Sequence, residues 1–314
     1  MAIVPVPRRG WPGRGRGGRV GARAVRLALL LVASVVLGAR PSSAQLRYEE
    51  PEWYLRVERG CRLFVQEYGR GRDTLVVLHG GWGAEHSYLL GAFEGLEDRF
   101  HLVFYDQRGS LRSPCPDSLI SVDAHVADLE RLRAELGLER VTLVGHSMGT
   151  RLAMMYLAAY PERVGGLVLL APASLAPRPP ERVDSALAAR LGRDLQAFMS
   201  RPAVEAELRR AGLGPDSSRW SDEQRTVAWR IRFAGVNLYH VERWRMLEGG
   251  QVYYSRAAGE AAARSAPRDY DYTPALAAHR CPVWILQGDH DYGTLAVELQ
   301  RRWVREVPNV RHVV

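Results

Sequence analysis

A serine stands between two glycines in Gly145-His146-Ser147-Met148-Gly149, where a strand pattern passes into a helix pattern. The preceding VTLV is typical of a buried strand, and the following RLAMMYLAAYPERV is typical of an amphipathic helix. Where a strand and a helix cross so closely, glycines remove the Cβ atoms that would clash, and the central residue is strained. The Ser147 hydroxyl would then stand at a helix N-terminus, whose free N–H groups favour a developing oxyanion. This G-x-S-x-G pattern predicts a nucleophilic serine, and the alternative is a plain glycine turn.

A second glycine-rich turn, His79-Gly80-Gly81-Trp82-Gly83, follows the apolar run TLVVL. Acyl transfer needs a second N–H donor facing the carbonyl oxygen, and glycine lets the backbone approach that oxygen closely. We therefore expect the amides of Gly81 and Trp82 to form an oxyanion hole with the amide of Met148. Four polar residues in or near these turns are expected to brace loops rather than to act in catalysis: His79, Asp106, Arg108 and Ser110.

The segments around these turns alternate between strand and helix patterns. Strands are predicted over 62–69, 74–80, 100–106, 140–145, 166–172, 282–288 and 310–314, and helices over about 86–97, 121–137, 148–160 and 293–307. Several of the strands are continuous Val/Leu/Ile runs, as expected for strands that helices cover on both faces. The pattern predicts an α/β fold with a mostly parallel sheet flanked by helices.

The alternation breaks after the proline-rich APRPPE and resumes near Pro282. The intervening patterns are helical and rich in aromatics, so we expect a helical cap inserted into the α/β core. The predicted organisation is a core over 45–175, a cap over 176–273 and the rest of the core over 274–314. The cap aromatics are expected to pack between helices or to form an apolar lid: Trp220, Trp229, Phe233, Tyr239 and Trp244.

The motifs HGGWG, DQRGSLRS, GHSMGT and GDHD, in this order, resemble those of the α/β-hydrolase superfamily. HGG together with DQRGSLRS is most similar to its proline iminopeptidase-like branch, and the resemblance covers about residues 60–175 and 274–314. It implies the α/β-hydrolase fold and serine-based acyl transfer. Prolyl aminopeptidases favour GGSWG and RGSGRS where this chain has GHSMG and RGSLRS, so esterase activity stays open beside aminopeptidase activity.

The resemblance also implies an acid and a histidine after the serine in chain order. The G-x-x-D spacing counted from Gly288 selects Asp291 as the acid that orients the histidine, with Asp289 as the alternative. In relatives the histidine follows the next strand, in a loop before one last helix. Here that strand is VRHVV, which reaches Val314.

Two histidines lie near this acid loop, and neither fits the role of the base. His312 falls inside the predicted strand, short of the rim where a base would meet Ser147, and His290 is too close to the acid. We expect the catalytic histidine to lie beyond Val314, so that the core is truncated at its C-terminal end. The alternative is a protein that lacks a base and does not catalyse.

The first 44 residues resemble a secretion signal. An Arg-rich stretch precedes the apolar run LALLLVASVVLGA, and Ser42 and Ala44 fit a cleavage site before Gln45. The apolar run is shorter than the roughly 20 residues that span a bilayer. We therefore expect export to the periplasm or the extracellular space, with no membrane attachment after signal cleavage.

The net charge of +8 is confined to this leader. It carries eight arginines and no acid, and the remaining 35 arginines balance the 35 acids, so nucleic-acid binding is not expected. Three scattered cysteines, Cys61, Cys115 and Cys281, lack metal-ligand spacing, although two of them could form a disulfide in an exported protein.

These features predict a serine hydrolase that cleaves small ester or amide substrates through an acyl-enzyme. No metal and no organic cofactor is implied, because the sequence shows no ligand cluster and no phosphate-binding loop. An aminopeptidase would need an acid in the cap to hold the substrate amine, and Asp222, Glu223 and Glu242 are the candidates. The alternative function is a non-catalytic small-molecule binder on the same fold.

Overall fold

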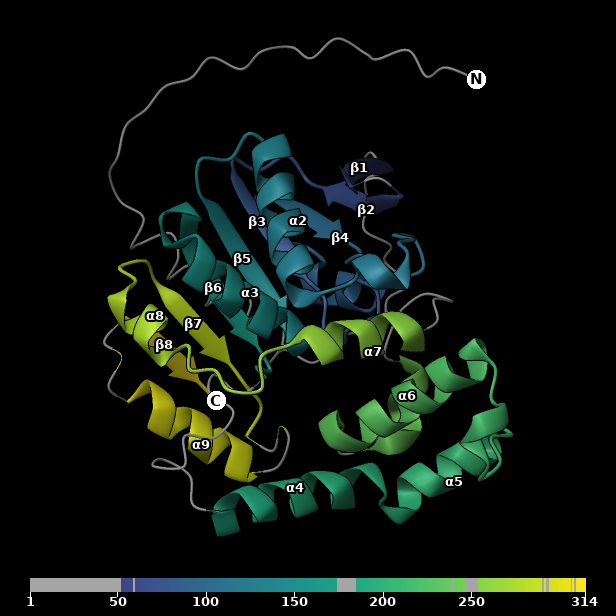
Figure 1. The fold of residues 1–314 in the computed structure, drawn as a ribbon. Coiled ribbons are helices and arrows are strands. Elements are labelled where there is room, and N and C mark those ends of the chain that lie inside the picture. The colour runs from purple at the N-terminus through teal and green to yellow at the C-terminus, as the bar shows by residue number, and fades with distance from the viewer. Residues whose placement is uncertain are drawn as a thin grey trace, which may run out of the picture.

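The computed structural model describes residues 52–58, 60–173, 185–238, 240–246, 254–289, 291, 294–305, 307 and 309–314. The predicted leader, residues 1–44, lies outside the described residues, as do Tyr239 and His290. Eight strands form one sheet (Figure 1): β1 Glu52–Glu58, β2 Cys61–Tyr68, β3 Asp73–Leu78, β4 Phe100–Tyr105, β5 Val141–His146, β6 Val164–Leu170, β7 Val283–Leu286 and β8 Val310–Val313.

The strand order in this sheet is β1-β2-β4-β3-β5-β6-β7-β8. The pairs β1/β2 and β2/β4 are antiparallel, and every pair from β4/β3 to β7/β8 is parallel. The predicted mostly parallel sheet is therefore confirmed. Strand β1 was not predicted from the sequence, because it is an edge strand whose residues are mostly exposed and which lacks the buried Val/Leu/Ile run that marked the others.

The described α-helices alternate with the strands or lie between β6 and β7. In chain order they are α2 Val122–Glu135, α3 Met148–Ala159, α4 Ser185–Met199, α5 Pro202–Arg210, α6 Asp222–Asn237, α7 Arg256–Ser265, α8 Thr273–Ala278 and α9 Thr294–Val304. Short 3₁₀-helices cover Ser87–Phe93, Asp117–Leu119, Pro161–Arg163, Ser217–Arg219 and Val241–Met246. The helix expected over 86–97 is thus only a 3₁₀-helix, which ends before Gly95 at φ +84°. A left-handed residue cannot continue a helix, and glycine adopts this conformation without penalty.

The central strands bury side chains on both faces of the sheet. In β3, Val76 and Leu78 pack into a large cluster with side chains of α2 and α3, whereas Leu75 and Val77 pack with Leu89 and Phe93 on the other face. Alternation of side chains along a strand sends neighbours to opposite faces, so a strand covered on both sides must be apolar throughout.

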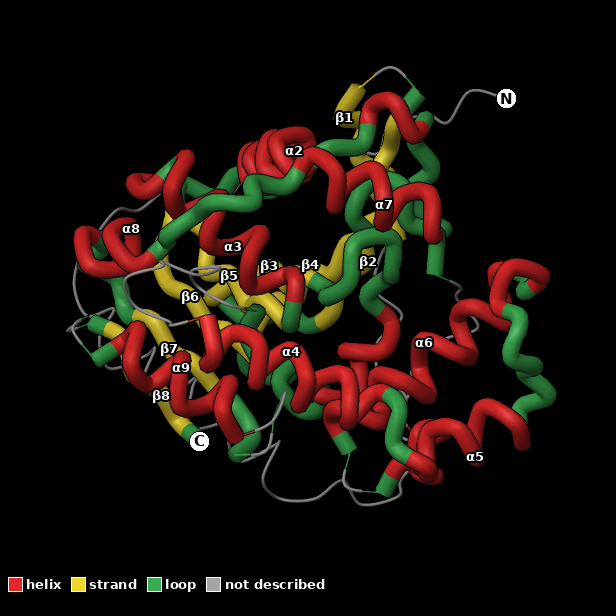
Figure 2. The backbone as a smooth tube through the Cα atoms, turned by 60° about the horizontal axis from the view of Figure 1, so that its bottom comes forward, coloured by secondary structure: helices red, strands yellow, loops and turns green. Residues whose placement is uncertain are grey.

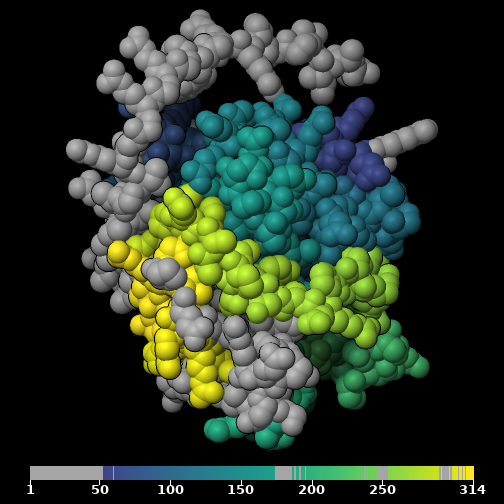
Figure 3. Space-filling view, turned by 60° about the vertical axis from the view of Figure 1, so that its left-hand side comes forward, coloured from purple at the N-terminus to yellow at the C-terminus, as the bar shows by residue number. Residues whose placement is uncertain are grey.

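The described elements between β6 and β7 are helices, and some of them form a separate core, whereas α7 and α8 pack into the main cluster through Ala258, Ala262 and Leu276. Side chains of α5, α6 and the 3₁₀-helix Val241–Met246 form this separate cluster, which includes Val204, Leu208, Ile231 and Trp244. Figure 1 shows α4, α5 and α6 below the ends of the strands, and Figure 2, in which the bottom of that view comes forward, shows α4 in front of the sheet. In the space-filling view the yellow-green surface of α7 and α8 adjoins the teal surface of the first part of the core (Figure 3).

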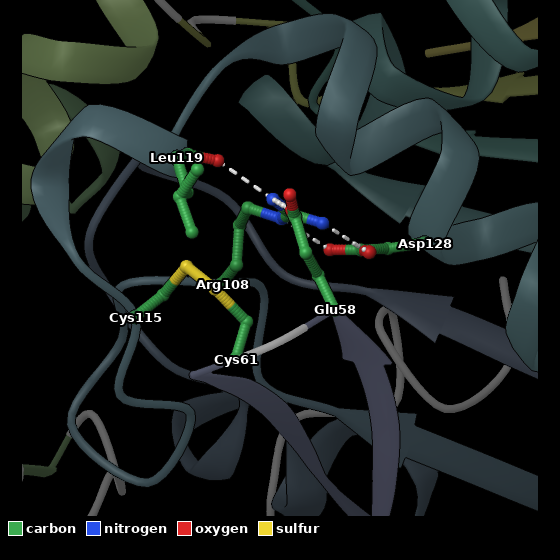
Figure 4. Close-up of a disulfide and its surroundings, with 6 residues drawn as sticks. All are labelled: Glu58, Cys61, Arg108, Cys115, Leu119 and Asp128. Carbon is green, nitrogen blue, oxygen red and sulfur yellow. Dashed lines mark hydrogen bonds and ion pairs between the residues drawn. A yellow bond between two sulfur atoms is a disulfide. The ribbon is translucent and has the colours of Figure 1, made fainter.

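A disulfide joins β2 to the loop between β4 and α2, and a buried ion pair joins the same loop to α2 (Figure 4). Cys61, the first residue of β2, is bonded to Cys115, and Cys281 is a buried free thiol. Arg108 donates two hydrogen bonds to Asp128, from Nε at 2.7 Å and from Nη2 at 2.6 Å. Its Nη1 also donates to the Leu119 carbonyl, so the guanidinium connects the loop after β4 with α2.

None of the helices in the described part of the chain is both long and apolar enough to cross a membrane.

The Arg108–Asp128 pair predicts a large loss of stability on substitution. Both side chains are buried, with 4% and 3% exposed, so Arg108→Met would leave the Asp128 carboxylate without a compensating charge. We expect the free energy of unfolding in urea to fall by about 3–5 kcal/mol. Arg163→Met, which breaks the exposed Arg163–Glu162 pair, should change it by less than about 1 kcal/mol. Equal effects of the two substitutions would contradict this interpretation.

Candidate active site

Ser147 occupies the sharp crossing between β5 and α3. Its backbone has φ +50° and ψ −118°, one of two positive φ values among the described residues that are not glycine. Its N–H donates to the Leu170 carbonyl at 3.0 Å, and its carbonyl accepts from the Thr150 N–H at 3.0 Å. These bonds hold a conformation that costs free energy for a residue with a side chain. The local sequence therefore folds as the G-x-S-x-G pattern predicts for this segment.

Three glycines make this crossing sterically possible. A Cβ on Gly149 would lie 2.3 Å from the Leu78 carbonyl oxygen, and a Cβ on Gly145 would lie 2.7 Å from the Gly149 carbonyl oxygen. On the facing loop, a Cβ on Gly80 would lie 2.8 Å from the Ser147 Cβ. The ends of β3 and β5 and the start of α3 are therefore packed backbone to backbone around the serine.

Ser147 opens into a cavity of about 620 Å³ between the α/β core and the helices that follow β6. The core contributes Gly80, Gly81, Tyr88, His146, Ser147 and Met148. The helical segment contributes Met199, Ser217, Trp220, Arg225, Ala228, Trp229, Arg232, Phe233, Val236, Tyr254 and Arg256. A cavity of this size, mostly apolar and with a few convergent polar groups, is typical of a site for a small molecule.

The three residues predicted to form the oxyanion hole lie at or beside this cavity. Gly81, at φ +72°, and Met148 both line it. Met148 is the first residue of α3, so the helix itself provides no partner for its amide. The Trp82 side chain is buried and stacks on His125 with ring centroids 5.2 Å apart. This contact anchors the loop that carries the amides of Gly81 and Trp82.

His146, the residue before Ser147, connects the core to the helical segment. Its Nδ1 lies 2.7 Å from the Tyr88 hydroxyl, which accepts a hydrogen bond from the Gly80 N–H at 2.7 Å. Its ring packs edge-on against Phe233, with centroids 6.0 Å apart. Burial lowers the pKa of His146 to about 4. His146 is therefore neutral at neutral pH and is a weak base.

His79 braces the loop after β3, as the sequence analysis expected. Its Nε2 accepts a hydrogen bond from the Gln107 N–H at 3.0 Å, so its Nδ1 carries the proton and donates to the Gly80 carbonyl. Gln107 Nε2 donates to the His79 carbonyl at 2.9 Å. These bonds fix the backbone that leads into Gly80 and Gly81. Neither His79 nor Gln107 lines the cavity.

Glu85, His86 and Asp106 form a buried polar cluster whose ligand-type atoms lie within 4.8 Å of one another. Arg112 already pairs with both carboxylates, at 2.7 Å from Glu85 Oε2 and 3.0 Å from Asp106 Oδ2. Burial opposes ionisation of Asp106, but the hydrogen bond from His86 and the Arg112 charge lower the pKa of Asp106 to about 2. An arginine between the acids makes this a bracing network rather than a cation site.

Asp291 follows β7, and its side chain is 9% exposed. No described residue donates a hydrogen bond to its Oδ2, and burial raises the pKa of Asp291 to about 6. A buried carboxylate oxygen without a donor is costly, and carboxyl groups with a shifted pKa concentrate at functional sites. Asp289, the alternative acid, lies two residues earlier in the same loop.

His312 lies within β8, where it pairs in register with Ile285. Its Nε2 lies 3.2 Å from Gln287 Oε1, and its side chain does not line the cavity. The other candidate base, His290, lies outside the described residues. Of the histidines with described positions, only His146 reaches the cavity wall, so the structure does not bring a basic histidine next to Ser147.

The aromatics between β6 and β7 divide into two groups. Trp220, Trp229 and Phe233 line the cavity, whereas Trp244 is buried in the separate helical core. The acids proposed to hold a substrate amine do not line it, and all three are exposed: Asp222, Glu223 and Glu242. The sequence analysis did not identify Tyr88, Arg225, Arg232 and Tyr254 as cavity residues, since their positions depend on how the helices pack.

Comparison with known proteins places this fold in one class. The model of the α/β hydrolase fold family matches residues 73–314, and the chain therefore belongs to the α/β-hydrolase family. Within this family it is a hydrolase of the proline iminopeptidase-like group. It is 30% identical to a proline iminopeptidase of Lactobacillus acidophilus over 237 residues, which covers 71% of this chain and 76% of that protein.

Two further relatives agree with this assignment. A proline iminopeptidase of Lactobacillus helveticus is 31% identical over 244 residues, with 71% of this chain and 76% of that protein covered. The crystal structure of a proline iminopeptidase-related protein from Thermus thermophilus superposes with a TM-score of 0.58 and 29% identity. It covers 85% of this chain and 89% of that one.

The raised pKa predicts that ionised Asp291 destabilises this chain. The folded pKa of about 6 lies above the ordinary value of 3.8, so this carboxyl group stabilises the fold fully below about pH 4. That contribution is lost as the pH rises through 6. We expect Asp291→Asn to raise the free energy of unfolding at pH 7–8 by up to about 3 kcal/mol, and to have little effect at pH 4. Urea unfolding at both pH values measures this, with the exposed Asp98→Asn as control. A gain in the free energy of unfolding that does not depend on pH would refute the raised pKa of Asp291.

Proposed function

We propose that this chain is an exported serine hydrolase that cleaves small ester or amide substrates through an acyl-enzyme, in the manner of an esterase or an aminopeptidase. The observation that carries the proposal is the position of Ser147. A polar residue at φ +50° is held by three close glycine contacts at the mouth of an aromatic cavity. Strain of this kind persists only where the surrounding structure over-determines it, and it clusters at functional sites.

In the proposed reaction the Ser147 oxygen attacks the substrate carbonyl carbon while a base removes the hydroxyl proton. The amides of Met148 and of Gly81 or Trp82 bind the oxygen that becomes negative. The tetrahedral intermediate then expels the alcohol or amine, which takes the proton from the base, and leaves an acyl group on Ser147. Water attacks this ester by the same route and restores the serine.

We assign the base to a histidine supplied from beyond Val314 and oriented by Asp291. The support is the buried Asp291 Oδ2 that no described residue satisfies. Buried polar atoms without partners are concentrated from His279 onward, and seven of the thirteen such atoms in the described residues belong to this stretch: His279, Trp284, Gln287, Asp291, Gln300, Asn309 and His312. Natural structures leave few buried polar groups unpaired, and this grouping near β7 and β8 supports the proposed assignment.

The proposed export rests on the leader pattern and on the Cys61–Cys115 disulfide. Disulfides persist in oxidising compartments and are rare in reducing ones. The alternative function, a non-catalytic binder of small molecules, is favoured by the lack of a basic histidine at the cavity among the described residues. The two functions differ in whether Ser147 becomes acylated.

Replacing Ser147 tests the proposal. In a chain extended past Val314, Ser147→Ala should reduce kcat for aryl esters by at least about a thousandfold, because no other hydroxyl replaces the nucleophile. The midpoint of thermal unfolding should not fall, since alanine is no larger than serine at this strained position. Hydrolysis that survives Ser147→Ala would refute the serine mechanism.

A fluorophosphonate probe tests the assignment of the base. We expect the probe to label Ser147 rapidly in the extended chain and slowly in the chain that ends at Val314, because proton removal from the hydroxyl needs the histidine. Asp291→Asn should slow labelling of the extended chain. Equal labelling rates for the two lengths would contradict this assignment, and no labelling of either would favour the non-catalytic binder.

A further inference from the structure

Helix α6 presents one continuous face to the cavity. Its residues Arg225, Trp229, Arg232, Phe233 and Val236 line the cavity wall, and this i, i+4, i+7, i+8, i+11 spacing places them on one side of a helix. Trp229 reaches the oxyanion loop, because a Cβ on Gly81 would lie 3.7 Å from its Cζ2 atom. On this α6 face, Trp229 lies between Arg225, about one turn before it, and Arg232, about one turn after it.

The charge of the described cavity wall has one sign. Three arginines line it, and no aspartate or glutamate with a described position does. Arg256 is exposed and pairs with Glu260 at 2.6 Å, so its charge is already compensated. Among the described residues, the Arg225 guanidinium donates only to the Ser218 carbonyl, at 3.4 Å, which does not neutralise its charge. Arg232 lies over the Trp220 ring, 5.6 Å from its centroid, and forms no ion pair with a carboxylate in the described part of the chain.

The aromatic rings of the wall are poorly placed to hold a second cation. Trp220 already lies against the Arg232 guanidinium. The Trp229 ring is stacked on Phe233, with centroids 5.1 Å apart, and on Tyr254, with centroids 6.4 Å apart. A substrate ammonium would thus be repelled by two uncompensated arginines. Among the described residues it would find neither a carboxylate nor a free aromatic face for a cation–π contact. A substrate carboxylate would meet planar donors that bind it by charge-assisted hydrogen bonds.

We infer that the cavity selects substrates whose acyl part carries an anionic group, such as a carboxylate, and that Arg232 with Arg225 binds that group. This inference rests on the proposed function in that the cavity is the one into which Ser147 opens. The bound anion would fix the acyl chain along Trp229, with its carbonyl at the oxyanion loop. Acyl groups that end in an ammonium, as an aminoacyl group does, would be disfavoured.

Equilibrium binding tests the inference without any turnover. The ligands are three N-methyl amides of similar length that end in a carboxylate, a methyl or an ammonium: those of adipic acid, hexanoic acid and ε-aminocaproic acid. Calorimetric titration of the 314-residue chain should show the adipic amide binding at least tenfold more tightly than the hexanoic amide. The ε-aminocaproic amide should bind more weakly than either, because the arginines repel it.

Variants of Arg232 assign the effect to this side chain. Arg232→Gln should reduce the preference for the adipic amide over the hexanoic amide by about ten- to a hundredfold, and Arg232→Lys should retain part of it. Arg232→Glu should shift the preference toward the ε-aminocaproic amide. The matched control is Arg219→Gln, in the same helical segment but 88% exposed and paired with Asp216, which should change none of the affinities.

The two proposals fail in different ways. Equal affinity for the adipic and hexanoic amides, or a preference that survives Arg232→Gln, would overturn the anion-binding inference and would leave the serine mechanism untouched. Failure of Ser147 to react, by contrast, would remove the proposed hydrolase activity, whereas the binding preference and its loss in Arg232→Gln would still show an anion site in the cavity.

Discussion

The close crossing of β5, α3 and the loop after β3 is the constraint on which the rest of the structure depends. At this point backbone packs against backbone, and a single methyl group on Gly149 would overlap the Leu78 carbonyl. The crossing can form only if β3 and β5 are adjacent and parallel, so that their carboxyl ends meet at the same edge of the sheet. The hydrogen bond from the Ser147 N–H to the Leu170 carbonyl extends the same requirement to β6.

The two sides of the cavity differ in charge. On the core side, burial keeps His146 and His79 neutral, because the pKa of each lies below its ordinary value. Charged groups of the core, such as Asp106 and Arg112, are paired with each other away from the cavity wall. Charge at the cavity comes instead from the helical segment, through Arg225 and Arg232. The core can therefore support one chemistry while the helices determine which substrates reach it.

Much of the core was predictable because its signals are local. Val/Leu/Ile runs mark the central strands, and glycine spacing marks the turn at Ser147, since both reflect short-range geometry. β1 was missed because an exposed edge strand carries little apolar signal. The contact between Tyr88 and His146, 58 residues apart in the chain, and the Cys61–Cys115 pairing depend on the three-dimensional arrangement of distant segments.

The helical segment was less predictable in detail. Its aromatics are similar in sequence, yet Trp229 and Phe233 face the cavity and Trp244 faces the separate helical core. Which of its side chains face the cavity depends on how α6 is rotated about its own axis when it packs on its neighbours. The same rotation places Arg232 at the cavity and leaves Asp222 and Glu223 exposed, and the amino-acid pattern alone did not reveal it.

Helix α6 packs into the separate helical core with one side and lines the cavity with the other. Ile231 and Ala234 pack into the separate helical core, whereas Arg232 and Phe233, their neighbours in sequence, line the cavity. Mutations on the cavity side can therefore alter ligand preference without disturbing the packing that keeps the segment folded. A protein built in this way can acquire new substrates through a few changes along one helix, while the serine and its surroundings stay as they are.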